Sequence, residues 1–210
     1  MFINHLPFLI IISSPSGAGK STLCKMIINN DPLIRLSISA TTRAKRPQEI
    51  DGQHYFFVSH EEFILMQQKQ EFLESAKVFD NLYGTPKKMV DDSLKNGHCV
   101  LFDIDWQGAR QIRSFYPAQQ IVSIFILPPS LPELERRLRA RAQDPEKVVL
   151  DRMKKACDEI EHFHEYDYFV INDDLNKSYQ NIRSIIEAKR IARQDPRDIN
   201  RFINQFNIRK

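Results

Sequence analysis

Residues 14–22 read Ser-Pro-Ser-Gly-Ala-Gly-Lys-Ser-Thr, with two glycines ahead of a Lys-Ser pair. The apolar run Phe8–Ile12 precedes this stretch, and a helical pattern with Leu23, Met26 and Ile27 on one side follows it. A strand, a glycine-rich turn and a helix in this order form the setting of a phosphate-binding P-loop. The alternative is an ordinary strand-to-helix turn that happens to contain two glycines.

The residue types in this turn suit the phosphates of a nucleoside triphosphate. Gly17 and Gly19 allow a tight turn that brings backbone N–H groups close to phosphate oxygens, and the helix N-terminus adds partial positive charge. Lys20 can reach the outer phosphates, and the Ser21 hydroxyl can bind Mg²⁺. The usual pattern begins with glycine where this chain has Ser14, which we interpret as a tolerated variant. A P-loop serves ATPases, GTPases and small-molecule kinases alike, so other parts of the chain must decide between them.

The composition is that of an ordinary globular protein. A chain of 210 residues, 42% hydrophobic and 27% charged, is long enough for one large domain with a sizeable core. The net charge of +3 argues against a dedicated nucleic-acid binder, which would carry a dense basic face. No segment predicts a membrane span or a signal peptide. The 3 cysteines are far apart and predict free thiols, which fit a reducing cytosol. Together, the charge, the absence of a predicted membrane span and the free thiols lead us to expect a cytoplasmic protein without membrane or nucleic-acid partners.

Apolar strand candidates alternate with helical patterns along most of the chain. The strand candidates lack polar alternation, as strands do when both faces of a parallel sheet are buried. They are Phe8–Ile12, Cys99–Ile104, Ile121–Leu127 and Tyr168–Ile171. The helical patterns between them are Trp106–Phe115, Leu131–Arg141, Lys147–Phe163 and Leu175–Arg190. The alternation predicts an α/β fold with a parallel sheet core flanked by helices.

Residues from about 39 to 90 break this alternation. They contain the strand-like run His54–Val58, a helix start at Ser59 with Glu62 as capping partner, and a second strand at Glu71–Phe79. This segment predicts an inserted mixed subdomain. Residues from about 136 to 157 are rich in arginine and are interrupted by Asp-Pro at 144–145, which predicts a helical lid.

The C-terminal residues 191–210 carry a helical apolar stripe. Its members, Ile199, Phe202, Ile203 and Phe206, recur at the spacing of one helix face. Docking of this face on the chain's own core is the simpler interpretation, and contact with a second copy in a homodimer is the alternative.

Four further segments carry motifs whose order along the chain is informative. These segments are residues 39–55 (Ser-Ala-Thr-Thr-Arg-Ala-Lys-Arg-Pro-Gln-Glu, then Gly52 and Tyr55), 71–85 (Glu-Phe-Leu-Glu, then Tyr-Gly-Thr), 101–108 (Leu-Phe-Asp-Ile-Asp-Trp-Gln-Gly) and 171–174 (Ile-Asn-Asp-Asp). With the P-loop variant, they resemble the motifs of guanylate kinases in family order, from about Phe8 to Arg190. The resemblance implies a domain at about residues 7–190 that transfers the γ-phosphoryl of ATP to GMP, with Mg²⁺ as cofactor and the insert as GMP-binding subdomain.

The phosphate of GMP is expected to bind the arginines of the first motif. Arg43 and Arg46 offer planar forks that suit bidentate phosphate binding, and Tyr55 and Tyr83 can add hydroxyl donors. Two arginines of this kind would otherwise be a solvated surface pair. In all, the resemblance implies a GMP site made of Ser39, Arg43, Arg46, Glu49, Tyr55, Glu74, Tyr83, Thr85 and Asp105.

The guanine base presents N1–H and N2–H₂ donors beside the O6 acceptor. A carboxylate that accepts from both donors is the natural reader, and Glu74 stands at the matching family position. Ser39 and Thr85 can donate to O6, and Asp105 can accept from the exocyclic amine or hold a neighbouring arginine. An exposed strand carboxylate is the alternative for Glu74.

The remaining matched residues belong to the ATP side. Asp103 ends a predicted buried strand, at the edge where parallel sheets bind ligands, and is expected with Ser21 to hold Mg²⁺. The residues expected to bind ATP are Ser14, Pro15, Ser16, Gly17, Ala18, Gly19, Lys20, Ser21, Thr22 and Asn172. The residues with expected catalytic roles, which neutralise charge on the transferred phosphoryl, are Lys20, Arg43, Arg137, Arg141 and Arg152.

The lid departs from the family pattern, because Ala140 and Ala142 stand where glycines are usual. This departure puts the flexibility of the lid hinge in question.

Two other functions are alternatives to phosphoryl transfer to GMP. A related binding module that recognises phosphopeptides typically lacks a working P-loop, whereas Lys20 and Ser21 are present. A kinase of another monophosphate, such as a ribose phosphate, would give Glu74 no base to bind.

Overall fold

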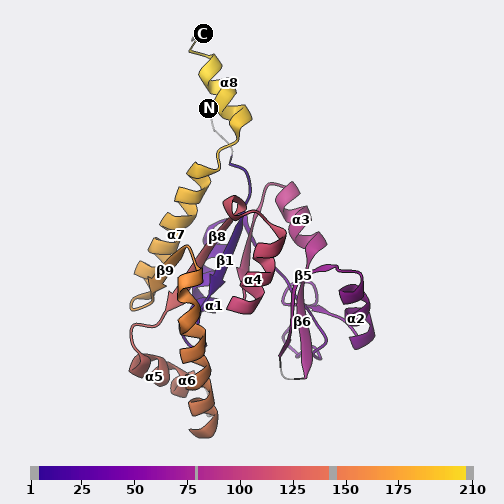
Figure 1. Ribbon diagram of the computed structural model, residues 1–210, viewed down its shortest axis with the longest axis vertical. Helices are drawn as coiled ribbons and strands as arrows, with labels where there is room; N and C mark the ends of the chain where they lie inside the picture. The colour runs from indigo at the N-terminus through magenta and orange to yellow at the C-terminus, as the bar shows by residue number, and fades with distance from the viewer. Residues whose placement is uncertain (1–4, 79, 142–145, 207–210) are drawn as a thin grey trace.

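The structure is a computed structural model that describes residues 5–78, 80–141 and 146–206. Its core is a five-stranded sheet in the order β2-β7-β1-β8-β9, and every neighbouring pair in it is parallel. The strands are β1 (Leu9–Ser13), β2 (Ile34–Leu36), β7 (Cys99–Asp103), β8 (Ile121–Leu127) and β9 (Tyr168–Ile171). The predicted α/β fold with a parallel sheet is confirmed (Figure 1).

Helices cover both faces of β1, which explains why its five residues are all buried. Ile10 and Ile12 pack in one apolar cluster with α1 (Lys20–Asn30) and α7 (Leu175–Ala192). Leu9 and Ile11 point to the other face, where they pack with α3 (Lys87–Lys95) and α4 (Trp106–Phe115). The strand that leads into the P-loop is therefore packed on both faces, as in a parallel sheet covered by helices.

The two edge strands differ from the expectation. β2 is not predicted from the sequence; it is three residues long, and only Ile34 of them is buried. In β9, Tyr168, Phe169 and Ile171 are exposed and only Val170 is buried. The expectation that this strand is buried on both faces is wrong, since it forms the sheet edge beside β8 alone.

A second, mixed sheet in the order β4-β3-β6-β5 forms the inserted segment. Its strands and helix are β3 (Ala40–Thr41), β4 (Phe56–Phe57), β5 (Phe72–Val78), β6 (Asn81–Pro86) and α2 (His60–Gln68). The predicted cap at Ser59 is present, and Glu62 completes the reciprocal capping box. Phe63 and Phe72 stack in a separate apolar cluster of this segment. Neither β3, β6 nor α3 is predicted from the sequence.

The arginine-dense segment forms α5 (Leu131–Arg141) and α6 (Glu146–Ile160), followed by a 3-10 helix at Glu161–Glu165. These helices project beyond one end of the sheet and share a small apolar cluster of their own (Figure 1). A second 3-10 helix, Ala118–Gln120, precedes β8. The Asp-Pro break at 144–145 and the departure at Ala142 lie outside the described residues.

The C-terminal helix α8 (Pro196–Asn204) extends away from the sheet at the opposite end (Figure 1). Its apolar stripe is largely uncovered, because Phe202, Ile203 and Phe206 are 36%, 44% and 59% exposed. The expectation that this stripe docks on the chain's own core is therefore wrong. Among the described residues, each helix is too short or too polar to span a lipid bilayer.

Candidate active site

The P-loop has the backbone shape that its glycines predict. Gly17 and Gly19 have φ angles of 90° and 99°, a left-handed conformation that other residues adopt only with strain. A side chain at Gly19 would also clash with the Asn172 amide. That amide donates to the carbonyl of Ala18 at 2.7 Å, so the motif after β9 lies directly against the P-loop. Ser14, which stands where the usual pattern has glycine, is buried, and its hydroxyl donates a hydrogen bond to the Pro15 carbonyl at 3.0 Å.

The two residues predicted to hold the metal, Ser21 and Asp103, lie together where the start of α1 meets the end of β7. Asp103, at the end of β7, forms an ion pair with Lys20 and accepts a hydrogen bond from the Ser21 hydroxyl at 3.3 Å. A hydroxyl and a carboxylate are the oxygen donors that Mg²⁺ prefers. Within the described part of the chain, no group of three or more His, Cys, Asp or Glu residues could hold a metal. Mg²⁺ at Ser21 and Asp103 would thus depend on phosphate and water oxygens for its other ligands.

A second cluster lies around Arg43, in the loop that follows β3 of the mixed sheet. The Arg43 guanidinium pairs with Glu49 at 2.6 Å and lies over the Tyr55 ring at 5.4 Å. The Tyr83 ring contacts that of Tyr55 edge-on, with ring centroids 5.9 Å apart. Glu49 also accepts the backbone N–H of Arg46 at 2.8 Å. These contacts, the Arg43 hydrogen bond foremost, lower the pKa of the Glu49 carboxyl to about 2, while the Arg46 side chain is exposed.

The predicted guanine reader is buried in the same sheet, and the alternative of an exposed strand carboxylate is wrong. Glu74 of β5 is 7% exposed, and its Oε1 accepts a hydrogen bond from the Thr85 hydroxyl of β6 at 2.7 Å. The Ser39 hydroxyl lies 3.4 Å from that of Thr85. Burial raises the pKa of the Glu74 carboxyl; nearby Asp105 adds to the rise and the Thr85 hydroxyl opposes it. A buried carboxylate with one hydroxyl partner is a strong acceptor for further donors.

Asp105 has a structural contact that is not predicted from the sequence. Its Oδ1 accepts the backbone N–H of Gly108 at 2.9 Å and so caps α4. Gly108 itself lies against Glu74, since an added Cβ would sit 3.5 Å from Glu74 Oε2. The short segment from Asp103 to Gly108 therefore joins the P-loop side of the site to the buried carboxylate.

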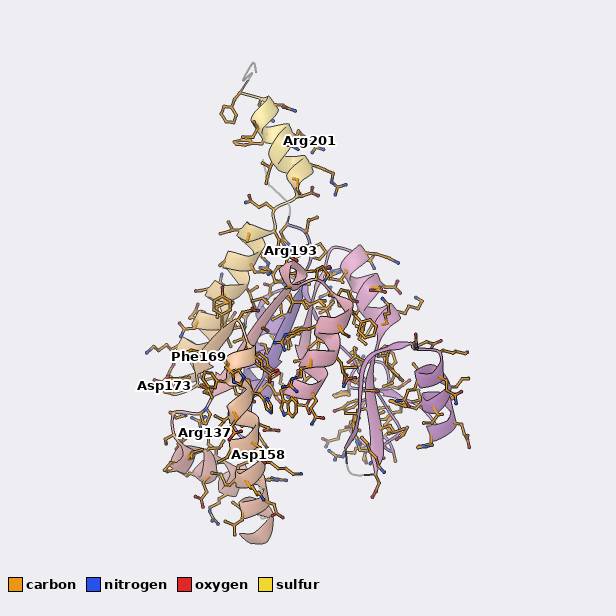
Figure 2. All side chains as sticks on the ribbon, viewed as in Figure 1. Arg137, Asp158, Phe169, Asp173, Arg193 and Arg201 are labelled. Carbon is orange, nitrogen blue, oxygen red and sulfur yellow. The ribbon has the colours of Figure 1, made fainter. Side chains whose placement is uncertain are left out.

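The arginines of the lid are placed unequally. Arg137 of α5 pairs with Glu133 at 2.7 Å and donates to the Asn172 carbonyl at 3.1 Å. It lines a cleft of about 410 Å³ together with Gly17, Gly19, Thr22, Ala140 and Asn172. Figure 2 shows Arg137 on the same side of the molecule as Asp173, which follows β9. Arg152 is half-buried on α6, and the side chain of Arg141 lies outside the described residues.

One residue of this region is not predicted from the sequence. Glu159, near the end of α6, accepts the backbone N–H of Ser16 in the P-loop at 3.1 Å. No local motif marks it, because its partner lies 143 residues away in the chain. Glu159 and Asp105 line a cleft of about 300 Å³ along the P-loop.

Known proteins resemble this chain over nearly its whole length. A family profile described as guanylate kinase matches residues 7–189. A guanylate kinase of Paramagnetospirillum magneticum is 52% identical over 97% of this chain and 95% of its own length. One of Cereibacter sphaeroides is 51% identical over 95% of this chain and 94% of its own. The crystal structure of guanylate kinase from Anaplasma phagocytophilum matches with a TM-score of 0.77 at 33% identity, over 100% of both chains. The buried carboxylate, the P-loop and these matches agree, and the chain belongs to the guanylate kinase family.

Proposed function

We propose that this protein transfers the γ-phosphoryl group of ATP to GMP, giving ADP and GDP, in guanine nucleotide biosynthesis and recycling. The observation that carries the proposal is the segment between the two half-sites. Asp103 contacts Lys20 of the P-loop, and Gly108, five residues on, lies against the buried Glu74. A triphosphate at the P-loop and a guanine at Glu74 would therefore face each other across one short stretch of backbone.

The chemistry requires positioning and charge neutralisation more than a covalent intermediate. An oxygen of the GMP phosphate forms a bond to the γ-phosphorus, and the bond from that phosphorus to the β,γ-bridging oxygen breaks, leaving ADP with the electron pair. Lys20 binds the outer phosphates on one side. Arg43 and Arg46 hold the acceptor phosphate on the other, with the hydroxyl groups of Tyr55 and Tyr83 as further donors.

The cofactor is proposed to be Mg²⁺, which neutralises phosphate charge when it is bound. Ser21 and Asp103 would hold it, and the Lys20–Asp103 ion pair keeps the carboxylate aimed at the P-loop. The lid arginines Arg137, Arg141 and Arg152 would add positive charge around the transferred group. Asn172, which already contacts the P-loop, belongs to the ATP side.

Guanine is read by Glu74, Thr85 and Ser39, with Asp105 beside them. A ribose phosphate would leave these polar groups without a base, and leaving a buried carboxylate unpaired is costly. We propose that dGMP is accepted as well, because none of the assigned residues contacts the ribose 2′-hydroxyl.

The proposed function is tested by measuring the release of ADP from ATP with GMP, dGMP, AMP and ribose 5-phosphate as acceptors in turn. Activity with GMP and dGMP alone supports the proposal, whereas turnover of AMP or ribose phosphate at a comparable rate contradicts it.

Two further properties are proposed. The exposed stripe of α8, where the rings of Phe202 and Phe206 lie 5.1 Å apart, would join two copies in a homodimer.

A cytoplasmic location is proposed because Cys24, Cys99 and Cys157 are free thiols. A reducing compartment such as the cytosol keeps cysteines in this reduced form.

A further inference from the structure

The lid helix α6 places a carboxylate on the P-loop. Oε2 of Glu159 accepts the backbone N–H of Ser16 at 3.1 Å. Burial raises the pKa of the Glu159 carboxyl; Asp105 adds to this rise, while Ser16, Lys20 and Lys155 oppose it. The carboxylate lines the same cleft as Lys20, Ser14, Gly17 and Ser21.

This position has a chemical consequence for phosphate binding. The backbone N–H groups of a P-loop and its lysine form an anion site for the phosphates of a nucleotide. A carboxylate is also an anion, and it uses one of those N–H groups as its donor. An outer phosphate next to Ser16 and Lys20 would compete for that donor and would meet the negative charge of Glu159 at close range.

The chain just beyond Glu159 is held firmly on the body of the protein. The ring of His162 stacks on Trp106 of α4 with centroids 3.7 Å apart. Glu165 accepts two hydrogen bonds from Arg110 of the same helix, at 2.8 Å and 2.7 Å. Glu159 therefore lies at the base of the lid, where it can leave Ser16 by a small tilt of α6 while the anchor on α4 stays in place.

We propose that Glu159 is an internal competitor of the ATP phosphates: it latches the lid to the P-loop through Ser16 and must release that N–H when the outer phosphates bind. The inference rests on the proposed binding of ATP at the P-loop. Its effect is to weaken ATP binding and to couple arrival of the triphosphate to movement of the lid. GMP binds at the mixed sheet and is outside this competition.

The test uses a Glu159→Gln variant, which keeps the size of the side chain but removes its charge. Asp158→Asn is the matched control, because Asp158 is the preceding residue of α6, is exposed and carries the same charge (Figure 2). Affinities for the non-hydrolysable analogue AMP-PNP with Mg²⁺, and separately for GMP, are measured by isothermal titration calorimetry on the full chain. We expect Glu159→Gln to bind AMP-PNP about 3- to 10-fold more tightly, with GMP affinity unchanged. This is the scale of the difference between a hydrogen bond to a charged acceptor and one to a neutral acceptor. The control should match the unmodified protein for both ligands.

A second measurement tests the contact itself. Hydrogen exchange at the Ser16 amide should be faster in a Glu159→Ala variant, which removes the acceptor, than in the unmodified protein. Unchanged or weaker AMP-PNP binding by Glu159→Gln, equal tightening by Asp158→Asn, or unchanged Ser16 exchange in Glu159→Ala would each overturn the inference. Failure of the proposed function is distinct from these results, because it would appear as an unmodified protein that forms no ADP from ATP and GMP.

Discussion

A Glu74→Gln variant should remain folded and lose most of its activity with GMP. Glu74 is 7% exposed, and its Oε1 already accepts the Thr85 hydroxyl. An ionised carboxylate retains enough lone pairs to accept guanine N1–H and N2–H₂ as well. The amide of glutamine carries one oxygen, so it either turns its NH₂ toward two guanine donors or offers them a single neutral acceptor.

The size of the effect follows from the bonds exchanged. Two hydrogen bonds to a charged group, each about 1.5–3 kcal/mol, are replaced by at most one neutral bond of about 1 kcal/mol. The net loss is about 2–5 kcal/mol, or roughly 30- to 4,000-fold in kcat/KM for GMP. The unmodified enzyme should prefer GMP over AMP by roughly 10⁴-fold, because AMP has no donors at these positions.

The assay is ADP release coupled to NADH oxidation, with kcat/KM measured for GMP and AMP on both proteins. Glu71→Gln is the matched control, since Glu71 is an exposed carboxylate just before β5, and its activity should be unchanged. Comparable kcat/KM values for GMP and AMP on the unmodified protein would refute the assignment of the base site. Full GMP activity in Glu74→Gln would refute the role of this carboxylate.

Three other perturbations have defined outcomes. Lys20→Ala should reduce kcat by about 10²–10³-fold or more, because it removes a charge from the transferring phosphates; near-native turnover by a folded variant would contradict the mechanism. The Arg110 hydrogen bond lowers the pKa of the Glu165 carboxyl to about 2, below its unfolded value, so this pair stabilises the protein above about pH 4.5 and ceases to do so as the pH falls toward 2. Arg110→Met should thus lower the free energy of unfolding at pH 7 and lower it less at pH 3. An equal loss at the two pH values in denaturant titrations would exclude this linkage. Removal of residues 196–210 should halve the mass seen by light scattering and leave kcat with ATP and GMP unchanged; an unchanged mass would show that α8 does not join two copies.

Much of the fold is predictable because it depends on neighbouring residues. The helix at Trp106–Phe115 and the strand at Ile121–Leu127 have the predicted bounds, since side-chain periodicity is a local property. The capping box at Ser59 is likewise present. The exceptions are short or lie at an edge: β2 has one buried residue, and β9 looks like a central strand in sequence but has a neighbour on one side only.

The sequence by itself determined the strand, turn and helix of the P-loop, because glycine conformations and apolar periodicity act over a few residues. It also determined, through motif order, which family the chain resembles. Only the tertiary structure decided which distant groups meet: the Asn172 amide on the Ala18 carbonyl, and Glu159 on Ser16. It also left the stripe of α8 uncovered, although the same spacing would serve for docking on the core. Periodicity states that a face is apolar, but what covers that face depends on how the chain folds back in space.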